Sequence, residues 1–436
     1  MIPLGRYPLY RALRPQHKRT RAEIDAFRDS RIRTMIAHAY RSVPFYRSLF
    51  DRNGILPTDI RGAADLVHIP ITTRSQIQEA SLSDRVANGI DRTSLLEFRT
   101  TGSTGQCLVV ARRWREQKLL SLFAVRAMRS YGLRPRDVIG VPRIKLPTHP
   151  RDNQIPRRIA DTLGFYTRVI VDPREGVDQV NALFDLQSEV VQGWPTILSE
   201  IAPKWRELRM RDAGRRGLRF VLTGGETMTS AARAQITQGF DAPVHDLYGA
   251  HETSLVAWQC AATGDYHLSD ETICAEVIRD GRHAAPGESG EMVVTALHSF
   301  AMPFIRYKLG DMVVQGSPAC TCGSPFSTIR AIQGRTADFL SLPNGRVVHP
   351  QDIARDSYRA AHWIKQVQVV QQATDRLELH VVPLREPSAG EVAAIRPAIE
   401  GLLGPGVSFD VVTVPSIERR MDSKFTVYRS NVANNL

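Results

Sequence analysis

Short apolar segments alternate with longer stretches of helical spacing through the middle of the 436-residue chain. Each segment is shorter than a buried helix would be and is separated from the next by polar or turn-forming residues. An alternation of buried strands with helices is typical of an α/β fold built on a parallel sheet. The expected strands are Val138 to Val141, Thr167 to Val171, Val190 to Val191 and Phe220 to Leu222.

The two ends of this region have different patterns. Residues 21 to 50 have helical spacing, and the residue before Pro44 interrupts the helix because proline excludes it from the α region. From about residue 270 the chain is a succession of strands and turns. The residues expected on the buried face of the first helix are Ile24, Phe27, Ile32, Met35, Ile36 and Tyr40, and the later strands include Cys274 to Ile278 and Glu291 to Val294.

The composition excludes several classes of protein. Lys and Arg number 57 against 45 Asp and Glu, a net charge of +12, but no tract of five or six like charges occurs. The densest basic stretch, residues 6 to 33, is expected to be a solvated helix face; the charge favours anionic ligands such as nucleotides, and we expect no nucleic acid partner. No apolar run approaches the roughly 20 residues of a membrane helix. Residues 1 to 14 lack the apolar core of a secretory signal, and the five cysteines suit a reduced, cytoplasmic protein.

A domain boundary is expected between Gly334 and Asp338. Beyond it, the pattern predicts strands at 367–370, 377–382 and 407–412 and a helix at 391–403. About 100 residues of this kind can form a small α+β domain. The sequence therefore predicts a large N-terminal α/β domain, 1–333, and a small C-terminal domain, 334–436.

A loop rich in glycine and hydroxyl residues lies between two expected strands, Leu95 to Phe98 and Leu108 to Val110. Its backbone N–H groups and hydroxyls can approach phosphate oxygens closely. It lacks the spacing of a GxxxxGK[ST] loop, and an exposed polar turn is the alternative interpretation. The loop residues are Thr100, Thr101, Gly102, Ser103, Thr104 and Gly105.

Further motifs follow this loop in a fixed order. They are Thr223-Gly-Gly-Glu226, Asp246-Leu-Tyr-Gly-Ala-His-Glu252, Arg306-Tyr-Lys-Leu-Gly-Asp311, Gly334-Arg335 with Asp338, and Ser423-Lys424. With these motifs the chain resembles the adenylate-forming, acyl-activating superfamily, and in particular its phenylacetate–CoA ligase branch. Ala37 to Tyr46 and His68 to Thr72 also resemble that branch, and the similarity extends from about residue 25 to 430.

The resemblance implies a fold and a reaction. In this superfamily a large N-terminal α/β domain and a small C-terminal α+β domain are joined by a hinge, here matched by Asp338. A carboxylate attacks the α-phosphate of ATP to give an acyl-adenylate and pyrophosphate, and the thiol of coenzyme A then displaces AMP. A carrier-protein thiol, an amine or a phenol is the alternative acceptor, and an inactive nucleotide-binding homologue is a further alternative.

The resemblance also implies roles for individual residues. The loop from Thr100 to Gly105 would hold the β- and γ-phosphates of ATP, and Tyr248 would lie against the adenine. Glu252 would help to bind Mg²⁺, a hard cation suited to carboxylate and phosphate oxygens. The motif residues Gly224, Gly225, Glu226 and Gly249 would belong to the same ATP site.

The remaining implied roles concern the ribose and the reacting groups. Asp311 would accept hydrogen bonds from both ribose hydroxyls, and Arg335 would reach the ribose or the phosphates. Lys424 would place a positive charge between the carboxylate of the acid and the α-phosphate. Asp311 as a turn residue and Lys424 as a surface lysine are the alternatives.

The chain departs from the family pattern at two positions. Gln106, followed by Cys107, stands where the loop usually ends in lysine and proline, and Ser423 replaces a glycine often found before the catalytic lysine. Glutamine cannot neutralise a phosphate charge, so we expect weaker ATP binding or pyrophosphate handling, with catalysis that is slower but not absent. The same departures are what favours the inactive homologue.

A second set of residues has metal-binding chemistry. Cys320 and Cys322 form a C-x-C turn, and Cys260 and His267 bracket a polar turn upstream. Three thiolates and an imidazole suit tetrahedral Zn²⁺, and four protein ligands leave no position open for water, which indicates a structural site. Members of the branch often carry such a cluster. His251 and His283 are alternative fourth ligands, and free buried cysteines are the other interpretation.

The acid pocket is the least defined part of the site. Its candidates are Val141 to Leu146, Gly193 to Pro195 and Thr223 to Gly225, because strands that end there would face the nucleotide. Trp194 either stacks on an aromatic acid or packs in the core; Arg143, with Lys145, either binds a polar group of the substrate or carries surface charge. We expect an aryl or arylalkyl acid, and a homodimer, which is common in the branch.

Overall fold

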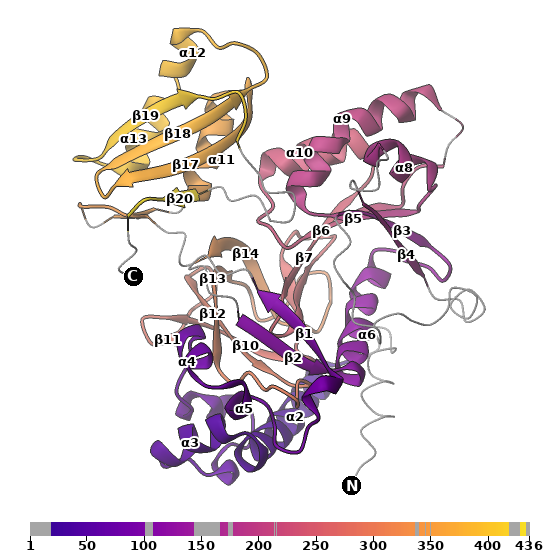
Figure 1. The fold of residues 1–436 in the computed structure, drawn as a ribbon, viewed down its shortest axis with the longest axis vertical. Coiled ribbons are helices and arrows are strands. Elements are labelled where there is room, and N and C mark those ends of the chain that lie inside the picture. The colour runs from indigo at the N-terminus through magenta and orange to yellow at the C-terminus, as the bar shows by residue number, and fades with distance from the viewer. Residues whose placement is uncertain are drawn as a thin grey trace.

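The computed structural model describes residues 19–100, 108–143, 166–172, 178–212, 214, 216–335, 340–344, 346–348, 350–417 and 428–432. Figure 1 shows its two unequal parts, a large sheet with its helices and a smaller sheet near the C-terminus. In the described ranges, no helix has both the length and the apolarity needed to cross a membrane.

The large sheet has 12 strands in the order β11-β10-β12-β13-β14-β9-β8-β7-β6-β5-β3-β4. Its parallel half consists of β3 (Val138–Pro142), β4 (Thr167–Val171), β5 (Val190–Gly193), β6 (Phe220–Gly224) and β7 (Val244–Ala250). Its antiparallel half consists of β8 (Ser254–Gln259), β9 (Tyr266–Leu268), β10 (Ile273–Arg279), β11 (Arg282–His283), β12 (Ser289–Ala296), β13 (Tyr307–Gln315) and β14 (Thr328–Arg335). Strand β7 is therefore the border between the two halves.

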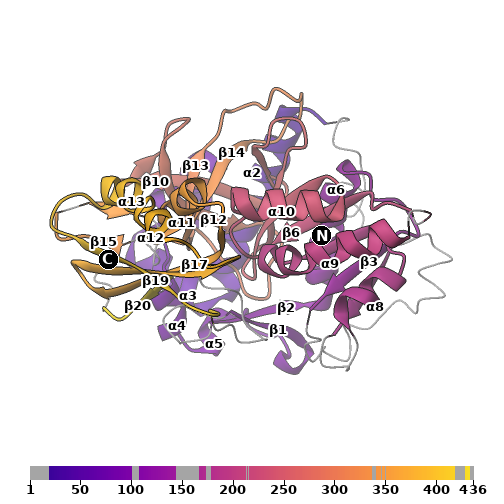
Figure 2. The same ribbon diagram turned by 90° about the horizontal axis from the view of Figure 1, so that it is seen from above.

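Helices cover both faces of the parallel half. Successive residues of a strand point to opposite faces, so alternate residues of β5 and β6 pack against different helices. Val191 and Val221 pack with α8 (Gln179–Asp185), α9 (Pro195–Arg211) and α10 (Ser230–Phe240) on one face. Val190, Phe220 and Leu222 pack with Met128, which lies on α6 (Trp114–Ser130), on the other face. Figure 2 shows α9 and α10 side by side over the sheet. Burial on both faces explains why these strands are short, uninterrupted apolar segments.

The antiparallel half is strongly curved. Three strands, β8, β9 and β14, lie between β7 and β13 in the sheet order, yet the Tyr248 hydroxyl on β7 is 2.5 Å from an Asp311 carboxylate oxygen on β13. Apolar side chains such as Val256, Val277 and Val294 fill the space enclosed by this curvature. The curvature brings the motifs of β7 and β13 together.

The N-terminal segment packs on the start of β13. It contains α2 (Arg21–Ser42), α3 (Pro44–Arg52), α4 (Arg74–Glu79) and α5 (Leu82–Arg85), with short 3₁₀ turns at Pro57–Asp59, Ala63–His68 and Arg92–Ser94. The Thr72 backbone pairs with Tyr307, and buried Arg306 donates to the carbonyl oxygens of Val67 and Ile69 while forming an ion pair with Glu276. Arg306 thus anchors the His68–Thr72 motif.

Two strands form a separate hairpin around the predicted phosphate loop. They are β1 (Leu95–Thr100) and β2 (Leu108–Arg113), and Thr100 pairs with Leu108 at the end of the hairpin. The predicted pair of strands is confirmed. Arg112 on β2 donates to the carbonyl oxygen of His251, so the hairpin contacts the turn that follows β7.

The C-terminal part is a four-stranded sheet in the order β19-β18-β17-β20 with helices packed on it. Its elements are β15 (Leu340–Ser341), β16 (Val347–Val348), α11 (Pro350–Ala360), β17 (Ile364–Ala373), β18 (Arg376–Pro383), α12 (Ala389–Ala393), α13 (Arg396–Leu403), β19 (Ser408–Thr413) and β20 (Tyr428–Ser430). This is the small α+β unit that the sequence predicts. The expected boundary between 1–333 and 334–436 remains a prediction, and Asp338 lies outside the described residues.

Two segments of helical spacing are each divided in the structure near a proline, and only the second division was not predicted. The predicted interruption before Pro44 is confirmed: α2 and α3 are separated at Val43, and Pro44 is at the first position of α3, where its missing N–H costs nothing. The expected helix over 391–403 is α12 and α13, with Pro397 near the start of α13. A proline inside a continuous helix would remove a hydrogen bond and clash with the preceding turn.

Candidate nucleotide and acid site

Glycines at the ends of β6 and β7 occupy positions where a larger residue does not fit. A Cβ atom on Gly224 would lie 2.5 Å from the carbonyl oxygen of Leu247, and one on Gly249 would lie 2.9 Å from that of Ser254. Gly225 has a φ of 82°, a conformation that favours glycine. These glycines therefore let β6 lie close to the backbone of β7, and β7 close to that of β8, at the carboxyl end of the parallel strands.

Tyr248, Asp311 and Arg335 come together across the curved sheet. The Tyr248 hydroxyl donates to Asp311, and Asp311 lies opposite Arg335 in the pairing of β13 with β14. Burial, followed by the charge of Asp311, raises the pKa of Tyr248 well above its usual value, so the phenol stays protonated and donates. Arg335, opposite Asp311 in this pairing, is exposed.

Glu252 lies in the turn after β7, next to this group. It is buried, and the Tyr307 hydroxyl on β13 lies 3.4 Å from one of its oxygens. Burial raises the pKa of Glu252, and the positive charges of Arg74 and Arg112 oppose that shift. A buried carboxylate between two cations can serve as a ligand for a hard metal ion that a phosphate chain also binds.

Arg112 is a member of this site that the sequence interpretation missed. It lies on β2 with only 2% of its surface exposed, and its Nη2 donates to the carbonyl oxygen of His251, the residue before Glu252. The available signal was the alternation of β2, because Leu108, Val110 and Arg112 share the buried face of the strand. A charged residue at a buried position of an apolar strand indicates a site.

Two predicted residues of the Thr223–Glu226 motif have partners within the protein. The Thr223 hydroxyl donates to Asp246 over 2.7 Å, and Tyr266 donates to the other oxygen of that carboxylate over 2.8 Å. Glu226 accepts hydrogen bonds from the backbone N–H and the hydroxyl of Thr196, in the first turn of α9. Thr223 is 1% exposed, so its side chain holds β6 against β7 rather than lining an open pocket.

Arg143 and Trp194 lie at the same edge of the sheet as the motifs. Arg143 follows the end of β3, and Trp194 follows the end of β5, as the parallel topology requires. Arg143 is exposed and Trp194 is partly buried, and Trp194 is the residue from which α9 begins. The structure therefore brings both to the carboxyl edge of the parallel strands.

Part of the predicted site lies outside the described residues. This holds for residues 101–107, which include Gln106 and Cys107, for residues 144–165, and for Asp338, Ser423 and Lys424; the Thr100 side chain is also not described. Their proposed roles remain predictions.

The four predicted zinc ligands converge on one point. The ligand atoms of Cys260, His267, Cys320 and Cys322 all lie within 4.8 Å of one another. The Sγ atoms of Cys260 and Cys320 are 3.9 Å apart, and Cys322 Sγ is 3.5 Å from Nε2 of His267. Pairing of β9 with both β8 and β14 brings the two halves of the cluster together.

The alternative ligands, His251 and His283, are not in this cluster. The His251 ring stacks on Phe98 with their centroids 6.0 Å apart, and His283 is exposed, 3.7 Å from Glu276. Three thiols and one imidazole nitrogen at such distances fit a tetrahedral Zn²⁺ ion.

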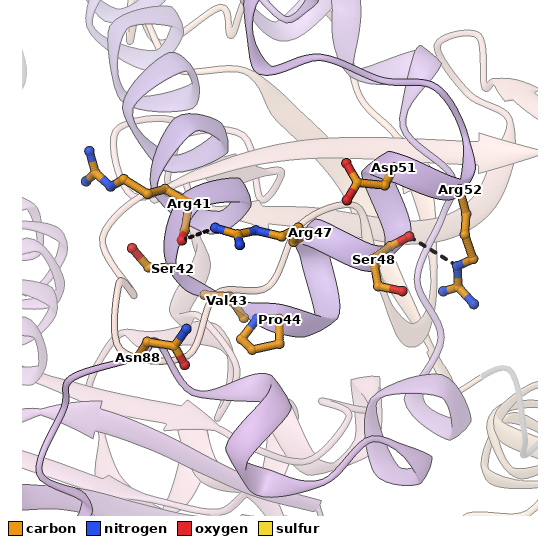
Figure 3. Close-up of a pocket in the computed structure, with 9 residues that line it drawn as sticks. All are labelled: Arg41, Ser42, Val43, Pro44, Arg47, Ser48, Asp51, Arg52 and Asn88. Atoms are coloured by element: carbon orange, nitrogen blue, oxygen red, sulfur yellow. Dashed lines mark hydrogen bonds between the residues drawn. The ribbon is translucent and has the colours of Figure 1, made fainter.

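A pocket of about 320 Å³ lies away from all these residues, between α2, α3 and Asn88 (Figure 3). It forms where the chain turns at Val43 and Pro44, and Arg47 closes one side by donating to the carbonyl oxygen of Arg41. None of the predicted site residues lines it.

Known proteins support the interpretation of these motifs. No protein-family model matches the chain. A phenylacetate–coenzyme A ligase of Thermus thermophilus is 27% identical over 344 residues, which cover 76% of this chain and 75% of that protein. A protein of the same name from Escherichia coli is 25% identical over 353 residues, covering 78% and 77%. The chain is similar to phenylacetate–CoA ligases over about three quarters of its length, and the predicted resemblance to that branch of the adenylate-forming superfamily is confirmed.

Solved structures agree with the fold of this superfamily. A 2-hydroxyisobutyryl-CoA ligase in complex with its acyl-AMP has a TM-score of 0.77 at 19% identity, covering 94% of this chain and 90% of that chain. An anthranilate CoA ligase bound to anthranoyl-AMP has a TM-score of 0.57 at 13% identity, covering 79% and 66%. The predicted fold class, an adenylate-forming ligase fold with a large α/β part and a smaller C-terminal α+β part, is confirmed.

Proposed function

We propose that the protein activates a carboxylic acid with ATP, forming an acyl-adenylate and pyrophosphate, and then transfers the acyl group to the thiol of coenzyme A. The observation that carries this proposal is the group at the border strand β7, where the Tyr248–Asp311 hydrogen bond lies beside the buried Glu252. An aromatic face, a hydroxyl-binding carboxylate and a metal-binding carboxylate are what adenine, ribose and a phosphate chain require.

Each residue of the proposed site has its own role in binding ATP or the acid. Tyr248 lies against the adenine, Asp311 accepts from the ribose hydroxyls, and Arg335 binds at the ribose or phosphate side. Glu252 holds Mg²⁺, which neutralises charge on the phosphate oxygens when it is bound. Lys424 binds the acid's carboxylate and the α-phosphate together, which places the nucleophile against phosphorus.

The first half-reaction needs no proton transfer. A carboxylate oxygen forms a bond to the α-phosphorus, the bond to the bridging oxygen breaks, and its electron pair leaves with pyrophosphate. In the second, the coenzyme A thiolate attacks the acyl carbon and AMP leaves with the electron pair of the acyl–oxygen bond. We propose an aryl or arylalkyl acid as the substrate, with Trp194 and Arg143 at the edge where its side chain would lie.

The acceptor separates this function from its nearest alternative. Purified protein, supplied with ATP, Mg²⁺ and an acid that it activates, should release AMP at a rate that increases strongly with coenzyme A. If pantetheine-bearing carrier protein, an amine or a phenol stimulates AMP release and coenzyme A does not, the acceptor is of another class. We also propose a homodimer in the cytoplasm; none of the four described cysteines forms a disulfide, which suits a reduced compartment.

We propose that Cys260, His267, Cys320 and Cys322 hold one structural Zn²⁺ ion. The purified protein should contain one zinc per chain, and Cys320→Ser or Cys322→Ser should lose it. Removal of the metal should lower the melting temperature by about 10 °C, because the ion cross-links segments far apart in the chain.

The matched control for zinc binding is Cys274→Ala. Cys274 is a solitary buried thiol, and burial raises its pKa to about 12, so its loss should leave the zinc content unchanged. Zinc is counted by atomic emission. A protein without zinc in all variants, with an unchanged melting temperature after chelation, would show that the four residues are ordinary thiols and a core histidine.

A further inference from the structure

The buried guanidinium of Arg112 lacks a carboxylate partner at bonding distance. Its Nη1 donates to the Gln117 side chain over 2.8 Å and its Nη2 to the His251 carbonyl oxygen, both neutral acceptors. Its Nε is buried and has no hydrogen-bond partner among the described residues. No ion pair to Arg112 occurs within that part of the chain, although the charges of Glu252 and Glu116 act on it.

Such a cation is costly unless something pairs with it. Arginine has five N–H donors, and only two of those on Arg112 are used within the described chain. Burial lowers the pKa of Arg112 to about 10, so the group remains charged at neutral pH. The guanidinium also lies over the Phe98 ring, 5.4 Å from its centre, which attracts a cation more weakly than an anion does. A buried charge without an anionic partner at bonding distance destabilises a folded protein. Its presence here indicates an anion that arrives with a ligand.

The position of Arg112 limits which anion this is. It lies on the buried face of β2, the strand that leaves the Thr100–Gly105 loop, and it holds the backbone next to Glu252. The sequence from residue 100 to 107 contains no lysine or arginine. Near Glu252, the positive charge of this hairpin is therefore supplied by Arg112 on β2.

We propose that Arg112 binds the phosphate chain of ATP and stabilises the charge that passes to pyrophosphate when the acyl-adenylate forms. The inference rests on the proposed function. When the bond between the α-phosphorus and the bridging oxygen breaks, the electron pair stays on that oxygen, and pyrophosphate gains one negative charge. A fixed guanidinium with three unused donors stabilises that charge, and Arg112 itself stays protonated throughout.

The test compares Arg112→Gln and Arg112→Lys with Arg113→Gln, an exposed arginine on the opposite face of the same strand. Binding of Mg²⁺·ATP and of AMP is measured by calorimetry, and ATP–pyrophosphate exchange gives kcat and the KM for pyrophosphate. Arg112→Gln should weaken ATP binding and raise the pyrophosphate KM by about 10²-fold, because one charged contact to the leaving group is lost. AMP, which lacks the β- and γ-phosphates, should bind as it does to the wild type.

Several results separate this role from others. Equal loss of ATP and AMP binding would show that Arg112 only supports the fold, and unchanged exchange by Arg112→Gln would overturn the inference. Arg112→Lys keeps the charge, so its ATP affinity and pyrophosphate KM should lie between those of the wild type and of Arg112→Gln. If Arg112→Gln lacks a cooperative melting transition, the values for Arg112→Lys serve as the test of the proposed role. If wild type exchanges with no acid, the proposed function fails, yet the ATP-against-AMP comparison still tests Arg112. Failure of wild type to bind ATP would overturn both.

Discussion

Replacing Lys424 by alanine is expected to abolish acyl-adenylate formation and to spare the second step. The positive charge would lie between two anions, the acid's carboxylate and the α-phosphate, and would hold the nucleophile in line with phosphorus. Loss of such a contact should lower ATP–pyrophosphate exchange by at least about 10²- to 10³-fold. Thioester formation from preformed acyl-AMP requires no approach of two anions, so its rate should change little.

The small C-terminal sheet offers a control substitution for Lys424→Ala. Lys424 belongs to the segment that leads into β20, and β20 pairs with β17 through Tyr428 and Val369. Lys365 is exposed on β17 of the same small sheet, so Lys365→Ala removes a lysine from this part of the chain without affecting the proposed site. Survival of both half-reactions in Lys424→Ala would show that this lysine is a surface residue.

Replacing Asp311 by alanine is expected to raise the KM for ATP about 10²-fold. The carboxylate would accept hydrogen bonds from two ribose hydroxyls, and hydrogen bonds to a charged group contribute about 1.5–3 kcal/mol each. Because the Tyr248 hydroxyl donates to Asp311, the variant Tyr248→Phe can be compared with Asp311→Ala. Tyr248→Phe keeps the ring that would face the adenine and removes only the hydroxyl, so its KM should rise less than about tenfold.

The comparison of the two variants decides what Asp311 does. If it binds ribose, ATP and AMP should both bind Asp311→Ala weakly, while Tyr248→Phe retains most of the affinity for each. Equal, small effects of both substitutions would mean that Asp311 only positions Tyr248. Melting temperatures of the two variants show whether either change acts through stability, since Tyr248 is a buried core residue.

The local features of the fold follow from the sequence with little ambiguity. The strand predicted at Thr167–Val171 has those bounds, and Phe220–Leu222 lies within β6, because segments buried on both faces leave a continuous apolar pattern. Pro44 and Pro397 lie at or near the start of a helix that follows an interruption, and only the first interruption was predicted. The second was not, because apolar residues continue at helical spacing across Ala394 and Ile395. The periodicity of apolar residues shows which face of a segment is buried. It does not reveal an interruption of the helix when apolar residues on both sides stay on that same face.

The contacts of the candidate site depend on pairing between distant strands, which spacing does not encode. Tyr248 meets Asp311 because the antiparallel half of the sheet curves, and Cys260 meets Cys320 because β9 lies between β8 and β14. These residues were predicted from the sequence because their motifs resemble those of a known family. Arg112 belongs to no quoted motif; the alternation of β2 was its one signal in the sequence, and its burial near Glu252 identifies it in the structure.

The most direct test of the proposed function is ATP–pyrophosphate exchange with Mg²⁺ in the absence of any acceptor. A panel of aryl, arylalkyl and short aliphatic acids is supplied one at a time, with ATP binding measured on the same preparation. The account predicts exchange that depends on an aryl or arylalkyl acid and proceeds despite Gln106. ATP binding without exchange for any acid would contradict it and would mark the chain as a nucleotide-binding homologue that forms no adenylate.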